Sequence, residues 1–140
     1  MIIEPHKLIK VLNWFLTTAA LGVSSGPVAA FDGAYDSTID RCYRMSDTRV
    51  IITGNKIEMW ESLCELRNPT AVRDIPGARI FDAACTGEGS RYGYRLMLIG
   101  GIPSYGEGYR QLAIDLYMVT ERGVHPLQRC PPGVGNVMYQ

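Results

Sequence analysis

The chain has 140 residues, of which 46% are apolar and 20% charged, and its 14 Lys and Arg balance 14 Asp and Glu. This composition is typical of one globular domain and excludes intrinsic disorder, collagen and coiled coil. Fifteen Gly, eight Pro and eight Tyr favour strands and turns over long helices. A zero net charge lacks the basic excess that binding a phosphate backbone requires, so no nucleic-acid partner is expected.

The first thirty residues have the regions of a secretory signal peptide. Basic residues within positions 6–10 precede an apolar stretch over 11–23, and small residues close the segment at Ala29 and Ala30. The apolar stretch of about 13 residues is shorter than the ~20 needed to span a bilayer, which favours cleavage over a retained anchor. Cleavage after Ala30 leaves one domain over 31–140, periplasmic or secreted, with no stable membrane insertion.

All four cysteines, Cys42, Cys64, Cys85 and Cys130, lie beyond this segment. An even number of cysteines in an oxidising compartment predicts two disulfides. No C-x-x-C pair occurs and His125 is the single histidine after residue 30, so we expect neither a metal nor a cofactor. Loop-closure entropy leaves the connectivity open, because pairing 42 with 64 and 85 with 130 is about as favourable as pairing 42 with 130 and 64 with 85.

Residues 31–42, at the start of the exported part, fit either a helical turn or a first strand. Asp36 or Ser37 could serve as the N-cap of a helix there, since short polar side chains accept hydrogen bonds from free backbone N–H groups. We favour a short N-terminal helix.

A β-hairpin is predicted next. Residues 50–53 and 56–60 are β-rich runs joined by Gly54 and Asn55, a strong turn signal. The second run continues to residue 66, but its apolar alternation changes from one face to the other midway. We interpret this change as a bulge or bend near Glu61 within one strand.

Further strands are predicted from alternating apolar residues over 79–85, 91–99, 111–120 and 124–130. Proline and glycine between 67 and 78 indicate a loop, and those after 131 a loose tail. Trp60 and Leu116 should be buried, because each lies in the middle of a predicted strand.

Five to six short strands at about ten-residue spacing indicate an all-β fold, a small antiparallel meander barrel or sandwich with a short N-terminal helix. In such a meander the strand holding Cys64 lies beside the strand holding Cys85. Closure of the sheet would bring Cys42 to Cys130. The meander therefore favours this pairing, with 42–64 and 85–130 as the alternative.

Motifs of catalysis are missing from the sequence. It has no G-x-S-x-G elbow, H-E-x-x-H or P-loop, and its late His125, followed by Pro126, makes a poor catalytic base. Glu61 and Glu65 share one face of a predicted strand, but such a pair is ordinarily a solvated surface. We therefore expect a protein that is not an enzyme.

The turn between the strands 79–85 and 91–99 is the most informative segment. Gly87 and Gly89 flank Glu88, so the backbone can approach a partner closely or take positive φ there. Ser90 and Arg91 then project from the start of a strand. The alternative is an ordinary bulged turn.

Residues 86–92 read Thr-Gly-Glu-Gly-Ser-Arg-Tyr. This stretch resembles the Ser-Gly-x-Gly-x-[Arg/Lys]-Tyr signature of bacterial periplasmic inhibitors of chicken-type lysozyme, with Thr86 in place of the first Ser. The resemblance implies a small antiparallel barrel whose loop enters the lysozyme cleft and presents hydroxyl and basic groups to its carboxylates. The later Lys-Gly motif of that family is not recognisable over 99–107, and Cys64 and Cys85 are additional.

The sequence therefore predicts a non-catalytic binding module for a protein or another envelope macromolecule. The residues expected to contact the partner lie in the turn and in a later Gly-rich loop: Glu88, Ser90, Arg91, Tyr92, Tyr105 and Tyr109. One alternative is a small-molecule barrel with a cavity lined by Trp60, Tyr94 and Leu96, although a six-stranded barrel normally fills its interior with side chains. Another alternative is that the protein is a structural component of an envelope assembly.

Overall fold

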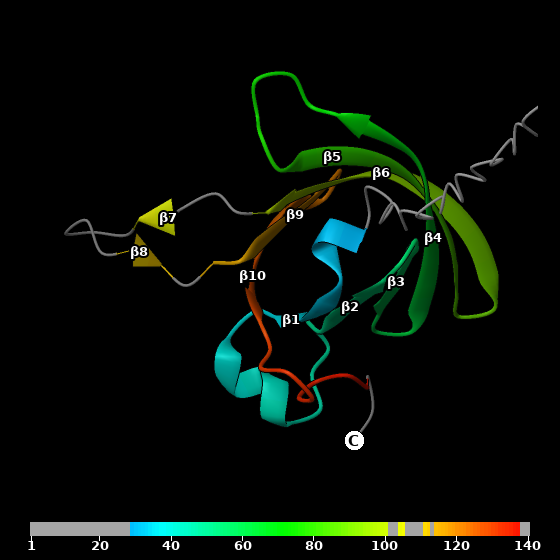
Figure 1. Ribbon diagram of the computed structural model, residues 1–140. Helices are drawn as coiled ribbons and strands as arrows, with labels where there is room; N and C mark the ends of the chain where they lie inside the picture. Colours follow the sequence, from blue (N-terminus) through cyan, green and yellow to red (C-terminus); the bar gives the residue numbers. More distant parts are fainter. Residues whose placement is uncertain (1–28, 101–103, 106–110, 113, 138–140) are drawn as a thin grey trace, which may run out of the picture.

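The computed structural model describes residues 29–100, 104–105, 111–112 and 114–137. Eight antiparallel strands close into a barrel in the order β1-β10-β9-β6-β5-β4-β3-β2 (Figure 1). Their bounds are β1 Gly33–Asp36, β2 Val50–Thr53, β3 Lys56–Met59, β4 Ser62–Ala71, β5 Ala78–Gly87, β6 Ser90–Gly100, β9 Leu116–Thr120 and β10 Gly123–Arg129. Strands β7 (Ser104–Tyr105) and β8 (Gln111–Leu112) form a separate pair, and two short 3-10 helices are η1 (Ala29–Phe31) and η2 (Ile39–Tyr43).

The all-β class and the two disulfides are confirmed, but the expected number of strands is wrong. The run 56–66 is two strands, because Met59 of β3 pairs with Ser62 of β4 across a two-residue turn. Trp60 and Glu61 form that turn, with Glu61 at φ 55°. The change of face in the sequence is therefore a hairpin and not a bulge.

The predicted N-terminal helix is also wrong. Residues 33–36 form strand β1, which pairs with β2 on one side and with β10 on the other. Both neighbours are needed to close the barrel, and they supply partners for the backbone polar groups that a helix would satisfy internally. Only the 3-10 helix η2 follows, and its N-cap is Thr38, whose side chain makes no capping hydrogen bond.

Other boundaries shift as well. Strand β4 continues to Ala71 through a register shift between Arg67 and Thr70, so the loop predicted over 67–78 shortens to 72–77. The strand predicted over 111–120 corresponds to β8 and β9, which belong to different sheets. Pro126 lies within β10, where that strand extends beyond its pairing with β1.

One core fills the barrel, built from inward residues of every barrel strand and from Phe31 of η1. Leu116 is buried as expected, at 1% exposure. Trp60 is only half-buried, because it stands in a turn instead of mid-strand.

The two disulfides join Cys64 to Cys85 and Cys42 to Cys130, the pairs that the meander favoured. Cys64 and Cys85 are directly opposed on β4 and β5 within the core. Cys42 and Cys130 belong to a second, smaller apolar cluster with Ala34. The disulfides indicate an oxidising environment.

Residues 131–137, expected as a loose tail, pack against the body of the protein. Val134 lies against the cluster of Cys42 and Cys130, Gly135 is buried, and Arg49 donates a hydrogen bond to the Val137 carbonyl. Among the described residues, no helix is long and apolar enough to cross a membrane. Residues 1–28 of the predicted signal peptide lie outside the described residues.

Candidate functional site

One end of the barrel opens into a cavity of about 990 Å³. Three two-residue turns contribute to its rim: residues 60–61 between β3 and β4, 88–89 between β5 and β6, and 121–122 between β9 and β10. Residues 47–49, which precede β2, complete it. The volume is at the upper end of the 300–1,000 Å³ range that is typical of ligand pockets.

Aromatic rings and thioethers line the interior of this cavity. Tyr92 and Tyr94 project from β6 into it with their rings stacked, 6.3 Å apart between centroids and inclined by 11°. Met59 and Met118 contribute flexible thioethers, which adapt to irregular apolar shapes. Tyr92 is 43% exposed, so part of its ring surface is open to solvent at the mouth.

The hydroxyl of Tyr94, a half-buried residue of the lining, lies near two sulfur atoms. Its oxygen is 4.0 Å from the Cys64 Sγ and 4.0 Å from the Met59 Sδ. Burial raises the pKa of Tyr94, Tyr92 raises it further, and Arg122 lowers it. The net shift is upward, so the phenol carries its proton at neutral pH.

The rim is acidic. Each of the three turns places one glutamate there: Glu61, Glu88 and Glu121. Arg122 and His125 also reach the rim, and all five of these side chains belong to exposed residues. None of the five takes part in an ion pair with another described residue.

Two glycines allow the turns to meet at the rim. A Cβ on Gly87 would stand 2.6 Å from the Glu61 carbonyl oxygen, so only glycine lets the end of β5 pass this close to the β3–β4 turn. In the β5–β6 turn, Glu88 and Gly89 take φ 47° and 75°. Positive φ at both central residues suits a two-residue hairpin, because it matches the twist of the strands.

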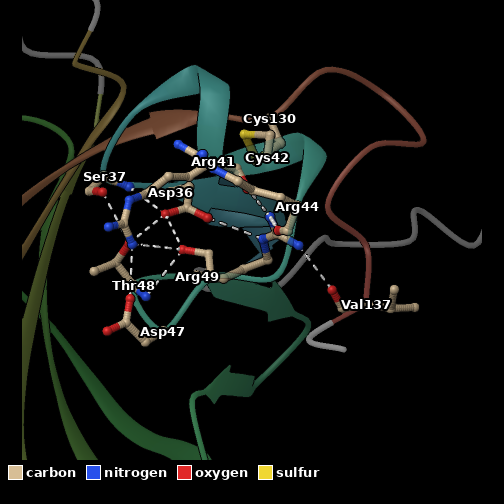
Figure 2. A network of polar contacts seen from close by, with 11 residues as sticks. Asp36, Ser37, Arg41, Cys42, Arg44, Asp47, Thr48, Arg49, Cys130 and Val137 are labelled. Atoms are coloured by element: carbon tan, nitrogen blue, oxygen red, sulfur yellow. Dashed lines mark hydrogen bonds and ion pairs between the residues drawn. A yellow bond between two sulfur atoms is a disulfide. The ribbon is translucent and has the colours of Figure 1, made fainter. Parts of the chain in front are cut away.

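A buried polar network stiffens the wall formed by residues 47–49 (Figure 2). The side chains of Asp36 and Arg49 are fully buried, and the Arg49 Nε lies 3.2 Å from a carboxylate oxygen of Asp36. The Ser46 and Thr48 hydroxyls donate to the same carboxylate at 2.9 and 2.5 Å. Arg49 donates its remaining hydrogen bonds to the backbone carbonyls of Arg41, Arg44 and Val137.

This network joins the end of β1, the helix η2 and the C-terminal segment beside the Cys42–Cys130 disulfide (Figure 2). Every buried side-chain polar atom in it has a partner, since the described residues contain no buried side-chain N or O atom without one. It is therefore a positioning element of the wall and not a free binding group.

The residues predicted to contact a partner are only partly brought together. Glu88, Ser90 and Tyr92 line the cavity, and the Ser90 hydroxyl donates to the Gly87 carbonyl at 3.1 Å. Arg91 is exposed but is not among the lining residues, because it alternates with Tyr92 along β6.

The later predicted contacts lie elsewhere. The backbone of Tyr105 belongs to β7, in the separate two-stranded sheet, and Tyr109 lies outside the described residues. Of the cavity residues expected for a small-molecule barrel, Trp60 and Tyr94 line the cavity. Leu96 is fully buried in the core instead.

The sequence reasoning missed several lining residues. Met59, Glu61, Met118 and the pair 121–122 were not recognised as parts of one site. The signal for the first two was present in the change of face near Glu61, which marks a turn at the barrel mouth. Among the described residues, no group of His, Cys, Asp or Glu is arranged to hold a metal ion.

Comparisons with protein-family models, with curated proteins and with solved structures give no match. The cavity and the hairpin beside it are therefore the features that can carry a functional proposal.

Proposed function

We propose that the protein is a non-catalytic binding module, periplasmic or secreted, that holds a small and mainly apolar ligand in the mouth of its barrel. The cavity of about 990 Å³ carries this proposal. Eight-stranded barrels are wide enough to hold one small ligand. The interior of an eight-stranded barrel either fills with side chains or holds one small ligand; here side chains fill the core, and the cavity lies at one end.

The distribution of polarity supports an amphipathic ligand. Tyr92, Tyr94 and Met118 give the interior apolar walls, while the charged side chains stand on the rim. The uncharged body of a ligand would lie inside, and any charged end that it carries would face solvent at the rim. Pockets that take small molecules commonly combine apolar walls with a few placed polar groups.

Binding can be measured on the chain of residues 31–140, in which Trp60 is the single tryptophan and lies on the cavity. We expect 2-acetylnaphthalene to change Trp60 emission and to raise the melting temperature in a saturable manner. A ligand at about 100 times its Kd stabilises the folded state by about 2.7 kcal/mol.

The variant Tyr92→Ala should weaken this binding, because it removes a ring from the cavity wall. The control Leu63→Ala changes a side chain that is 45% exposed and absent from the lining, and should leave binding unchanged. Equal loss in the two variants, or no saturable binding at all, would contradict the proposal.

A second candidate is recognition of an envelope protein by the β5–β6 hairpin. Ser90 and Arg91 are exposed at the start of β6, and the Cys64–Cys85 disulfide anchors the hairpin near its tip. The resemblance to lysozyme inhibitors supplies a partner to test. Replacing Ser90 and Arg91 by alanine should weaken binding by ~1–2 kcal/mol without changing the melting temperature. Absence of lysozyme inhibition by the unmodified protein in molar excess would reject that partner.

A further inference from the structure

Among the described residues, the hydroxyl group of Tyr94 has two weak hydrogen-bond acceptors near it. They are the sulfurs of Cys64 and Met59, each 4.0 Å from the hydroxyl oxygen. Cys64 is in a disulfide, so its sulfur carries no proton, and a thioether has none. Tyr94 must therefore be the donor in either contact, and sulfur is a weak acceptor.

The hydroxyl is also well placed for a ligand. Tyr94 lines the cavity, and its ring is held parallel to that of Tyr92. A phenol with the ordinary pKa of 10.0 keeps its proton at neutral pH, and burial raises the pKa of Tyr94 further, so the hydroxyl is available as a donor. A site that offers a directed hydrogen bond discriminates against ligands that lack the matching group.

We propose that Tyr94 is a specificity-determining residue, donating its hydroxyl proton to an acceptor oxygen of the bound ligand. The inference rests on the proposed function and narrows the ligand to an uncharged, mainly apolar molecule that carries a carbonyl or similar oxygen. The apolar body packs against Tyr92 and Met118, while the oxygen replaces the sulfurs as the acceptor. The glutamates Glu61, Glu88 and Glu121 on the rim disfavour a carboxylate in this role.

The test compares two ligands of nearly the same shape, 2-acetylnaphthalene and 2-isopropenylnaphthalene. The first carries a carbonyl oxygen where the second carries a methylene group. Calorimetry gives the ratio of their affinities in each protein. In Tyr94→Phe, the affinity for the ketone relative to the affinity for the hydrocarbon should fall roughly three- to tenfold, which corresponds to the loss of one neutral hydrogen bond. The affinity of the hydrocarbon should stay the same.

The variant Tyr92→Phe tests the neighbouring hydroxyl as the alternative donor, because it keeps the stacked ring. The control that should leave the ratio unchanged is Tyr43→Phe, which removes a hydroxyl from a tyrosine that is 64% exposed and lies outside the lining. A carbonyl stretching frequency of the bound ketone that is lower than in hydrocarbon solvent would support the hydrogen bond without any variant. An unshifted frequency would contradict it.

The outcomes separate the two proposals. Saturable binding of both ligands with a ratio that Tyr94→Phe does not change overturns the role of Tyr94 and leaves a ligand-binding barrel. The same holds if Tyr92→Phe produces the change instead. If neither ligand binds, the proposed function fails, and the role of Tyr94 fails with it.

Discussion

The buried pair of Asp36 and Arg49 gives the sharpest test of how the wall of the cavity is held. We consider the variants Asp36→Ala and Arg49→Met. Neither side chain is accessible to solvent, so each single change leaves the other charge inside the protein. Removal of one member of a buried ion pair costs about 3–5 kcal/mol, because the remaining charge has lost its water as well as its partner.

The contacts refine this magnitude. Asp36→Ala takes the shared acceptor away from the hydroxyls of Ser46 and Thr48 and from Arg49 together, so we expect the upper part of the range, about 4–5 kcal/mol. In Arg49→Met, the Asp36 carboxylate keeps its bonds from both hydroxyls and from the Ser37 backbone N–H. We expect about 3 kcal/mol for that variant.

The double variant leaves no buried charge behind. Its loss of stability should therefore be smaller than the sum of the two single losses by roughly 1–3 kcal/mol. Guanidinium unfolding followed by Trp60 fluorescence measures all three changes. The control is Asp47→Ala, which breaks the exposed pair with Arg41 and should cost less than ~1 kcal/mol. Single losses below that value, or strict additivity, would refute the assigned role of the network.

Three further predictions concern stability. Replacing Cys64 and Cys85 together by alanine should lower the free energy of unfolding by roughly 3.4 kcal/mol in the chain-entropy model, as measured in guanidinium; an unchanged value would contradict the contribution of that loop. Leu116→Ala should cost about 2–5 kcal/mol and the exposed Leu63→Ala less than ~0.5 kcal/mol, so equal losses would mean that the core is misassigned. Because burial raises the pKa of Tyr94 above its usual 10.0, the folded state binds more protons than the unfolded state above that pH; stability should fall as the pH rises past about 10, and less steeply in Tyr94→Phe.

Much of the fold could be predicted from local patterns. The hairpin at residues 54–55 and the strands β5 and β6 follow from alternation and turn residues, and their bounds are close to the expected ones. The pairing of Cys64 with Cys85 follows from the adjacency of consecutive strands in a meander. The identity of the strand that closes the barrel could not be predicted in this way, because β1 becomes a strand only through its non-local partners β2 and β10.

The candidate site was less accessible to the same reasoning. Its lining comes from strand ends that are far apart in the sequence. The local signals for it are the glycines of the β5–β6 turn and the change of face near Glu61. The ion pair of Asp36 and Arg49 left no signal, since an aspartate and an arginine 13 residues apart are common in any chain. The pair is buried only because η2 and the C-terminal segment fold over it, and this packing cannot be inferred from the local sequence.

The turn at residues 60–61 divides one predicted strand into β3 and β4 and forms part of the cavity mouth. The backbone conformation of Glu61 provides a direct test of this turn. Glu61 takes φ 55°, a left-handed conformation that costs most residues about 1–2 kcal/mol. Asparagine tolerates this region better than other side chains, so Glu61→Asn should stabilise the protein by ~0.5–1 kcal/mol, whereas the β-branched Glu61→Val should destabilise it by more than ~1 kcal/mol. The same two changes at Glu58, an extended residue on the outer face of β3, should rank in the opposite order, because valine favours strands. Denaturant midpoints that rank Asn and Val alike at residue 61 would mean that the chain runs through this point as one bulged strand, and the cavity mouth would then lack the turn that supplies Trp60 and Glu61.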